Sequence, residues 1–248
     1  MTARSPQDFR RRDILGLVGA GAFAATLPWP AHAQSVAGLK LGFIGAGREG
    51  GALGTLFAKA GHPVMFSSRH PETLTDLVTS AGPNAKAGTV EDAVAFGDVI
   101  VMVVPFSAVE QIGKDYGAAL AAKPLLMDVS NPIPRRDGED FVKQVNEMGG
   151  AGLATAKFIP GAKVVRAFGN FGAGMLAENA NKPDKNGVPI AGDDKGAIGV
   201  ASALITEIGY QPVLVGDLAI GKYVIPSPPL GGAHSVEEIK QIAATLKS

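Results

Sequence analysis

The chain has 248 residues, with 23 basic and 23 acidic residues and no cysteine. The lack of cysteine excludes disulfides, thiolate metal sites and iron–sulfur clusters. A formal net charge of zero gives no support for nucleic-acid binding. This length predicts one domain with a full hydrophobic core and at most a small appendage.

Residues 1–33 have the order of features found in an export signal. A basic segment with Arg11 and Arg12 is followed by an apolar run at 14–27, and then by the small-residue pattern Ala31-His32-Ala33. This order predicts a cleaved signal, and the paired arginines resemble the twin-arginine type. We therefore expect a periplasmic or secreted protein. The alternative is a cytoplasmic protein with a basic N-terminus.

Beyond the signal, short apolar runs alternate with amphipathic segments. The predicted strands are 40–44, 63–67, 85–87, 98–104, 125–129, 163–167, 188–191 and 211–215. The predicted helices are 49–60, 71–80, 89–95, 107–122, 138–148, 195–208 and 236–246. Strands that alternate with helices predict an α/β fold, a doubly wound parallel sheet of the Rossmann type. We place this domain at 34–223, followed by a C-terminal tail at 224–248 that ends in a helix.

A glycine-rich turn joins the first predicted strand to the first predicted helix. Its residues are Gly45, Ala46, Gly47, Arg48, Glu49 and Gly50. In this position a GxGxxG turn predicts dinucleotide binding. Gly45 allows the tight turn, Gly47 lets the pyrophosphate approach, and Gly50 lets the helix pack on the sheet. The helix N-terminus offers free N–H groups to the phosphates. The alternative is a glycine-rich turn that binds no ligand.

The end of the second predicted strand indicates which dinucleotide binds. Its residues are Ser67, Ser68, Arg69 and His70. NAD-specific sites usually place a carboxylate there for the ribose hydroxyls, and this chain has none before Glu72. A hydroxyl and a guanidinium donate hydrogen bonds and suit a 2′-phosphate. The sequence therefore favours NADP(H) over NAD. The alternative is that Arg69 is only a solvated loop cation.

Three further strand ends are expected at the nicotinamide half of the cofactor. In a doubly wound sheet the ligand lies beyond the carboxyl ends of the strands. The fourth predicted strand ends in Val104-Pro105-Phe106, and Asn131 and Asn170 follow the fifth and sixth. The two amides could hydrogen-bond a carboxamide or a substrate carbonyl. The alternative for each asparagine is a turn or cap residue.

No catalytic acid–base pair is evident in the sequence. His62, His70 and His234 are not at metal-ligand spacing, so we predict no metal site. We expect His62 to be a cap or surface residue and His234 to be solvated. Hydride transfer between two bound rings depends mainly on positioning. We therefore identify no catalytic residue and name Asn170 and Pro105 only as candidate positioning residues.

The chain resembles the NADPH-dependent reductases of deazaflavin coenzymes. The dinucleotide domain of that family is also similar to that of pyrroline-5-carboxylate reductases and of certain ferric reductases. The matching segments are 42–47, 60–62, 67–69, 103–105, 130–132, 163–168, 191–194 and 208–213. The resemblance covers residues 39–223. It implies NADPH on the Gly45 turn, its 2′-phosphate at Ser68 and Arg69, and the acceptor near Pro105 and Asn170. The stretch 223–232 departs from the family pattern, which leaves the acceptor open.

The residues and the resemblance together predict an NADP(H)-dependent oxidoreductase. It would transfer a hydride between NADPH and a second small redox acceptor, deazaflavin- or flavin-like. The alternatives are an exported non-catalytic NADP-binding protein and a subunit of another redox protein. The expected partner is a small-molecule hydride acceptor, with no nucleic acid, no membrane span after residue 34, and a homodimer as a further option.

Overall fold

A computed structural model describes residues 35–247, so the predicted signal at 1–33 lies outside the described residues. Eight strands form one sheet in the order β3-β2-β1-β4-β5-β6-β7-β8. The strands are β1 Leu41–Ile44, β2 Val64–Ser67, β3 Ala85–Gly88, β4 Val99–Met102, β5 Leu126–Asp128, β6 Val164–Arg166, β7 Gly187–Gly192 and β8 Gln211–Gly216. All eight lie within the predicted strand regions or overlap them.

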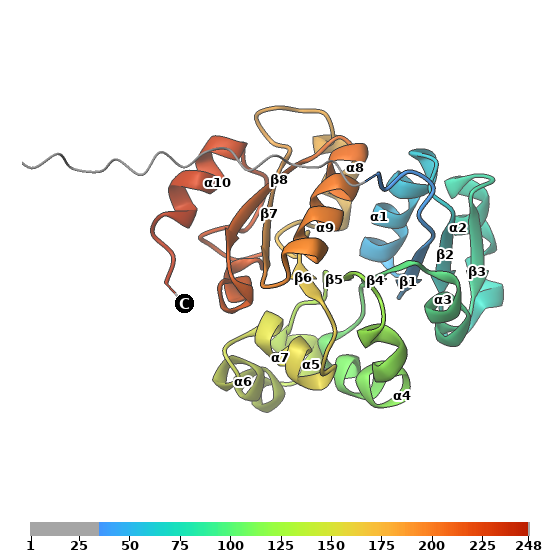
Figure 1. Ribbon diagram of the computed structural model, residues 1–248, viewed down its shortest axis with the longest axis horizontal. Helices are drawn as coiled ribbons and strands as arrows, with labels where there is room; N and C mark the ends of the chain where they lie inside the picture. Colours follow the sequence, from blue (N-terminus) through green and yellow to red (C-terminus); the bar gives the residue numbers. More distant parts are fainter. Residues whose placement is uncertain (1–34, 248) are drawn as a thin grey trace, which may run out of the picture. The chain divides into compact units, whose positions relative to one another are not determined.

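Helices cover both faces of this sheet. The α-helices are α1 Arg48–Lys59, α2 Thr75–Ala81, α3 Val90–Phe96, α4 Val109–Ala121, α5 Pro134–Asp137, α6 Glu139–Glu147, α7 Ala151–Phe158, α8 Ala173–Asn179, α9 Lys195–Glu207 and α10 Val236–Ala243. The 3₁₀ helices are η1 Pro71–Leu74, η2 Phe106–Ala108 and η3 Leu218–Tyr223. In Figure 1, α1, α8 and α9 lie on one side of the strands, and α4 to α7 lie on the other. In the described part of the chain, no helix combines the length and apolar character that a bilayer span needs.

The central strands explain why the sheet takes this order. Every residue of β1 and of β4 is buried, which is typical of strands covered on both faces. β1 pairs in parallel with β2 on one side and with β4 on the other. The connection after β1 therefore leads to β2 on one side, and the connection after β4 leads to β5 on the other side. A crevice opens between these two connections at the carboxyl ends of β1 and β4. The expected α/β doubly wound fold is confirmed.

The expectation of an all-parallel sheet is wrong at one junction. β7 pairs antiparallel with β6, through Val165 opposite Gly192 and Arg166 opposite Ala191. The connection from β6 to β7 contains only the seven-residue α8, about 10 Å of helix at 1.5 Å per residue. It packs on α1 and does not carry the chain back to the starting edge of the sheet. β7 therefore runs in the reverse direction, and β8 pairs in parallel with β7.

The C-terminal tail packs against this reversed pair of strands. Val224, Leu230 and Ile239 are buried in one hydrophobic cluster with residues of β7 and β8. The predicted terminal helix is α10, which begins with a capping box between Ser235 and Glu238. Residues up to 247 thus complete the same compact unit as the sheet.

His62 helps to cap the end of α1, as expected, because its N–H donates to the Phe57 carbonyl oxygen, but its side chain is buried and not at the surface. Its side chain is 1% exposed. Its Nδ1 lies 3.1 Å from the carbonyl oxygen of Leu39, and its Nε2 lies 2.6 Å from a carboxylate oxygen of Glu207. His62 therefore joins the segment after α1 to the end of α9, a partner 145 residues away that sequence reasoning had no means to find.

Candidate dinucleotide site

The three glycines of the turn are explained by three different constraints. Gly45 has a φ of 101°, and a Cβ there would lie 2.2 Å from the carbonyl oxygen of Val103. A Cβ on Gly50 would lie 2.2 Å from the carbonyl oxygen of Gly45. Gly47 has a φ of −69°, and no atom lies within 4 Å of its Cβ position. The fold therefore requires Gly45 and Gly50, whereas Gly47 leaves open space where a ligand can approach the backbone.

Helix α1 begins directly at this open space. Its N-cap residue is Gly47, and no side chain caps the helix there. The backbone N–H groups of the first turn have no intrahelical acceptor and therefore provide donors for phosphate oxygens. This geometry fits the pyrophosphate of a dinucleotide.

Alanine substitutions at Gly50 and at Gly47 distinguish the role of the turn in folding from its role in binding. We expect Gly50→Ala to lower the free energy of unfolding by about 3 kcal/mol, because the new Cβ collides with backbone. We expect Gly47→Ala to change it by less than about 1 kcal/mol and to weaken NADPH at least tenfold. Urea unfolding and fluorescence titration with NADPH measure the two effects. Unchanged NADPH affinity in Gly47→Ala would exclude this turn as the binding site.

A cavity of about 470 Å³ lies between the turn and the carboxyl ends of β4 and β5. Its walls are Gly47, Arg48, Glu49, Gly50, Val103, Val104, Pro105, Val129, Ser130, Asn131, Ile133, Arg136, Phe171, Gly172 and Pro226. The structure thus brings together most of the turn with the predicted Val104, Pro105 and Asn131. Sequence reasoning missed Arg136 and Pro226, because no local motif assigns the α5 start or the tail to this wall.

The predicted adenine end lies at the carboxyl end of β2. Ser68 is half-buried, and Arg69 and His70 are exposed. The Ser68 Oγ accepts a hydrogen bond from the His70 N–H at 3.0 Å, which fixes the loop and leaves its own hydroxyl hydrogen free. Within residues 35–247, no carboxylate forms an ion pair with Arg69. The neighbouring Glu72 instead places its Oε1 3.3 Å from the His70 Nδ1. The guanidinium is therefore available to an anionic ligand.

Two predicted cofactor contacts are buried and cannot reach a ligand. Ser67 is fully buried, and its Oγ accepts a hydrogen bond from the Gly45 N–H at 3.4 Å. Ser67 thus ties the turn to β2 and does not reach a 2′-phosphate. Phe106 is also fully buried, with its ring centroid 6.4 Å from that of Phe141. It belongs to the hydrophobic core below the cavity.

The two predicted asparagines bind the protein itself. The Asn131 Nδ2 donates to the Gly169 carbonyl oxygen at 2.7 Å, and its Oδ1 accepts from Arg166 at 2.7 Å. Its amide therefore fixes the cavity wall and is not free for a carboxamide. Asn170 is 2% exposed and donates to the carbonyl oxygen of Gly232 at 2.9 Å. Asn170 thus holds the tail through a partner 62 residues away and is not among the residues that line the cavity.

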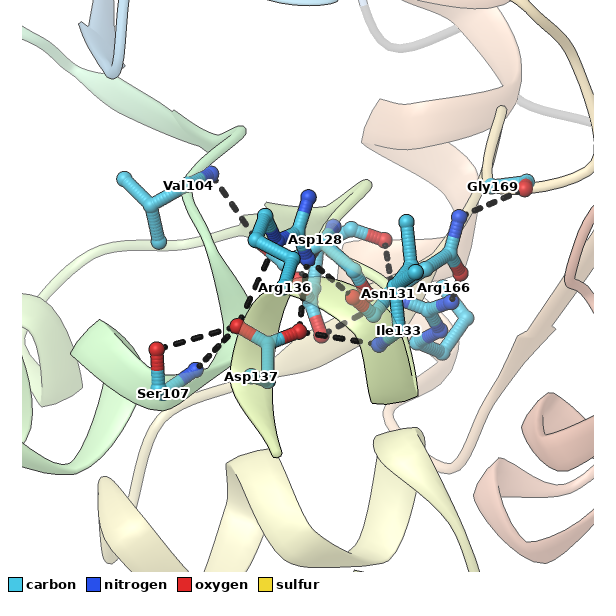
Figure 2. Close-up of polar contacts among 10 residues, drawn as sticks. Val104, Ser107, Asp128, Asn131, Ile133, Arg136, Asp137, Arg166 and Gly169 are labelled. Atoms are coloured by element: carbon cyan, nitrogen blue, oxygen red, sulfur yellow. Dashed lines mark hydrogen bonds and ion pairs between the residues drawn. The ribbon is translucent and has the colours of Figure 1, made fainter. Parts of the chain in front are cut away.

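A buried ion pair organises the nicotinamide end, and sequence reasoning missed it. Asp128 at the end of β5 and Arg166 at the end of β6 are both fully buried and lie 3.1 Å apart. Arg166 also donates to the carbonyl oxygens of Ser130 and Val224, the latter at 2.9 Å. The Asp128 carboxylate accepts from the Ser130 N–H and from the Thr155 hydroxyl. Figure 2 shows Arg166 beside Asp128 and Asn131. Through its further bond to Val224, one guanidinium connects two strand ends with the tail.

A second polar cluster lies at the cavity rim. The Asp137 carboxylate accepts hydrogen bonds from the Ser107 N–H and hydroxyl and from the Ile133 N–H, and it pairs with Arg136 at 2.9 Å. Burial alone would raise the pKa of Asp137, but these hydrogen bonds together lower it below its ordinary value. Asp137 therefore stays ionised and holds Arg136, a partly exposed cation of the cavity lining. Figure 2 shows this pair.

Glu49 is the acidic residue of the cavity wall. Burial raises the pKa of its carboxyl, against the opposing effects of the Ala173 N–H and of Arg48. Its Oε1 is buried, and no hydrogen-bond donor contacts it among the described residues. A hydroxyl or amide donor of a bound dinucleotide would satisfy that oxygen. The residues present therefore fit a dinucleotide, with Glu49 as an acceptor and the α1 N–H groups as donors.

Glu49→Gln is expected to change stability and binding with pH. Because folding raises the pKa of Glu49, the folded state gains stability from the protonated form below the ordinary pKa of 4.5 and loses it as the pH rises through the folded pKa. The free energy of unfolding of the variant should therefore equal that of the wild type near pH 4 and be larger than that of the wild type at pH 7. NADPH should bind about threefold more weakly to the variant at pH 8, because an amide oxygen is a weaker acceptor than a carboxylate for a hydroxyl or amide donor of the cofactor. Equal affinity at every pH would show that Glu49 accepts no hydrogen bond from the cofactor.

The fold and the glycine turn define the class: this is a Rossmann-type NAD(P)-binding domain of the kind found in oxidoreductases. Residues 40–132 match the family model described as NADP oxidoreductase coenzyme F420-dependent. The resemblance to that family is confirmed over this part, and with it the expected cofactor, NADP(H).

Relatives and solved structures extend the likeness beyond residue 132. A glycerol-3-phosphate dehydrogenase [NAD(P)+] of Staphylococcus epidermidis is 24% identical in an alignment of 209 residues that covers 69% of this chain. The chain spans 62% of the length of this curated relative. The crystal structure of a hypothetical protein of Sinorhizobium meliloti has a TM-score of 0.67 at 27% identity, covering 79% of this chain and 94% of that one. A candidate F420-dependent NADP reductase of Arthrobacter sp. FB24 has a TM-score of 0.64 at 21% identity over 75% of this chain and 88% of its own.

Proposed function

We propose that the protein is an NADP(H)-dependent oxidoreductase that transfers a hydride between NADPH and a second small redox acceptor. The observation that carries this proposal is the cavity at the carboxyl ends of β4 and β5, which is open at Gly47. NADPH supplies a hydride and is left as NADP+, while the acceptor takes up a proton from solvent.

The chain's own residues bind, orient and shield the reactants. The α1 N–H groups hold the pyrophosphate, and Ser68 and Arg69 hold the 2′-phosphate. Pro105 and the fixed Asn131 would form the wall beside the ring, and Pro226 from the tail lines the same cavity. These walls would position the two reactants, which is the main contribution a protein makes to direct hydride transfer.

A deazaflavin- or flavin-like acceptor is the finer part of the proposal. Its support is the description of the family that matches residues 40–132. The test is loss of NADPH absorbance with a deazaflavin, a flavin mononucleotide or a ferric chelate added, using Gly47→Ala as the control variant. Stoichiometric NADPH binding without turnover of any acceptor would favour the non-catalytic alternative. Sedimentation of the purified protein tests the homodimer.

We further propose that the protein is exported by the twin-arginine route with NADP already bound. Arg11 and Arg12 and the order of features in residues 1–33 support the export signal. The twin-arginine route carries folded proteins, so a cofactor bound tightly in the cytosol would travel with them. The experiment is to purify the exported form, denature it, and look for NADP in the supernatant. No NADP at any stoichiometry would contradict cofactor loading before export.

A further inference from the structure

A second cavity adjoins the dinucleotide cavity and has no role in the function as proposed so far. Its volume is about 400 Å³. It shares Asn131, Ile133 and Pro226 with the dinucleotide cavity, so the two spaces meet at the nicotinamide end. Its other walls come from the α5 start, from α6 and α7, and from the segment that follows η3.

The lining of this second cavity is apolar except at a few places. Val142, Ala151 and Ile225 contribute apolar surface, and Asn146 and Ser227 contribute neutral hydrogen-bonding groups. Lys222 is the one charged residue among those that line it. The pocket therefore suits a ligand with a largely apolar body.

Lys222 is held in place at this wall and has no anionic partner. Its Nζ lies 5.2 Å from the ring centroid of Tyr223, and no carboxylate pairs with it in the part of the chain described here. Gly150, with a φ of 94°, makes room for it, because a Cβ there would lie 2.5 Å from the Lys222 Cβ. Val224, two residues on, accepts the hydrogen bond from Arg166. The backbone just after Lys222 is thus held by Arg166, and Gly150 packs closely against Lys222 itself.

We propose that this second cavity binds the hydride acceptor, and that the acceptor is a compound with an apolar body and one acid group that pairs with Lys222. The role of this cavity as the acceptor pocket rests on the proposed function. Its preference for a ligand with an acid group over a neutral ligand does not. A neutral ligand would remove water from the ammonium group without replacing it by a hydrogen-bond acceptor, which costs free energy. A cationic ligand would meet Lys222, and no carboxylate is among the residues that line this second cavity.

The test compares ligands that share a naphthalene ring and differ in their head group. The probes are naphthalene-2-carboxylate, its neutral carboxamide and 2-naphthyl phosphate, with binding measured by calorimetry. We expect the wild type to bind the carboxylate about tenfold tighter than the carboxamide, as for a partly buried ion pair. Lys222→Met should abolish that preference, and Lys222→Arg should keep most of it. The phosphate arm shows which acid group the pocket prefers.

Lys157→Met is the matched control. Lys157 lines a different cavity of about 540 Å³ between α4, α6 and α7, so its loss should leave the preference intact. Equal binding of carboxylate and carboxamide by the wild type would overturn the proposal. A preference that survives in Lys222→Met, with unfolding curves showing both variants folded, would also overturn it.

A second measurement distinguishes this proposal from the proposed function. With NADPH bound, we expect nuclear Overhauser contacts between the nicotinamide C4 protons and the naphthalene ring. Competition between carboxylate and NADPH would assign the cavity to the cofactor and overturn the proposal. If the wild type binds the carboxylate through Lys222 but binds no NADPH, the proposed function fails and the acid-binding pocket stands.

Discussion

Arg69→Glu is expected to weaken NADPH about 100-fold and to leave NADH nearly unchanged. The substitution removes charge-assisted hydrogen bonds to the 2′-phosphate and puts a repelling carboxylate in their place. Each tenfold loss corresponds to about 1.4 kcal/mol, so the expected cost is about 2.8 kcal/mol. Arg69 is exposed, so its loss should not affect folding. Fluorescence titration with both reduced dinucleotides measures the ratio.

Two further variants sharpen this experiment. Arg69→Gln removes the charge without reversing it and should weaken NADPH about tenfold. Arg135→Glu makes the same charge reversal at an exposed position of α5 outside the cavity lining, and should change neither affinity much. If Arg69→Glu weakens NADPH and NADH equally, Arg69 is not the residue that selects the phosphorylated cofactor.

Arg166→Met is expected to lower the free energy of unfolding by about 3–5 kcal/mol, the largest stability loss among the variants considered. It leaves Asp128 charged and unpaired in a fully buried position, which is the costly way to break a buried pair. It also frees the carbonyl oxygens of Ser130 and Val224. NADPH should bind more weakly to the folded fraction, because the cavity wall loses its common donor. Urea unfolding gives the stability.

A double-mutant cycle with Asp128→Asn isolates the pair. The double variant should lose less than the sum of the two single variants, because neither charge then remains alone. Arg135→Met is the surface control and should cost less than about 0.5 kcal/mol. A loss below about 1 kcal/mol in Arg166→Met would show that the ion pair does not organise this end of the site.

The fold and the phosphate end of the site are largely readable from local sequence. Apolar runs such as those of β1 and β4 are strands because they are buried on both faces, and that burial is visible as an unbroken run of apolar residues. Gly45 and Gly50 mark the turn because their roles are local in the chain. The open space at Gly47 follows from the same motif.

The sequence does not show whether a strand runs parallel or antiparallel to its neighbour, or how deeply a side chain is buried. The residue pattern of β7 is the same whether it runs parallel or antiparallel to β6. Ser67 stands beside the predicted phosphate contact Ser68, and Phe106 stands beside the wall residue Pro105, yet both are fully buried. Whether a residue points to the cavity or away from it depends on the register of neighbouring elements and not on its distance from a motif.

The nicotinamide end was unpredictable for a different reason. Its wall is fixed by the pairing of Asp128 with Arg166 and of Arg166 with Val224, and the second pair is 58 residues apart. Arg166 alone, in a strand of otherwise apolar residues, is equally compatible with an edge position. Only the assembled sheet brings its guanidinium under the loop at Ser130.

This wide spacing sets an order in which the protein acquires its site during synthesis on the ribosome. The segments of β1, α1 and β2, with the loop at Ser68 and Arg69, are all made long before Val224. The wall at Ser130 and Asn131 is therefore complete only after Val224 has been made, and a chain that ends before the tail lacks one of the acceptors that hold the Arg166 guanidinium.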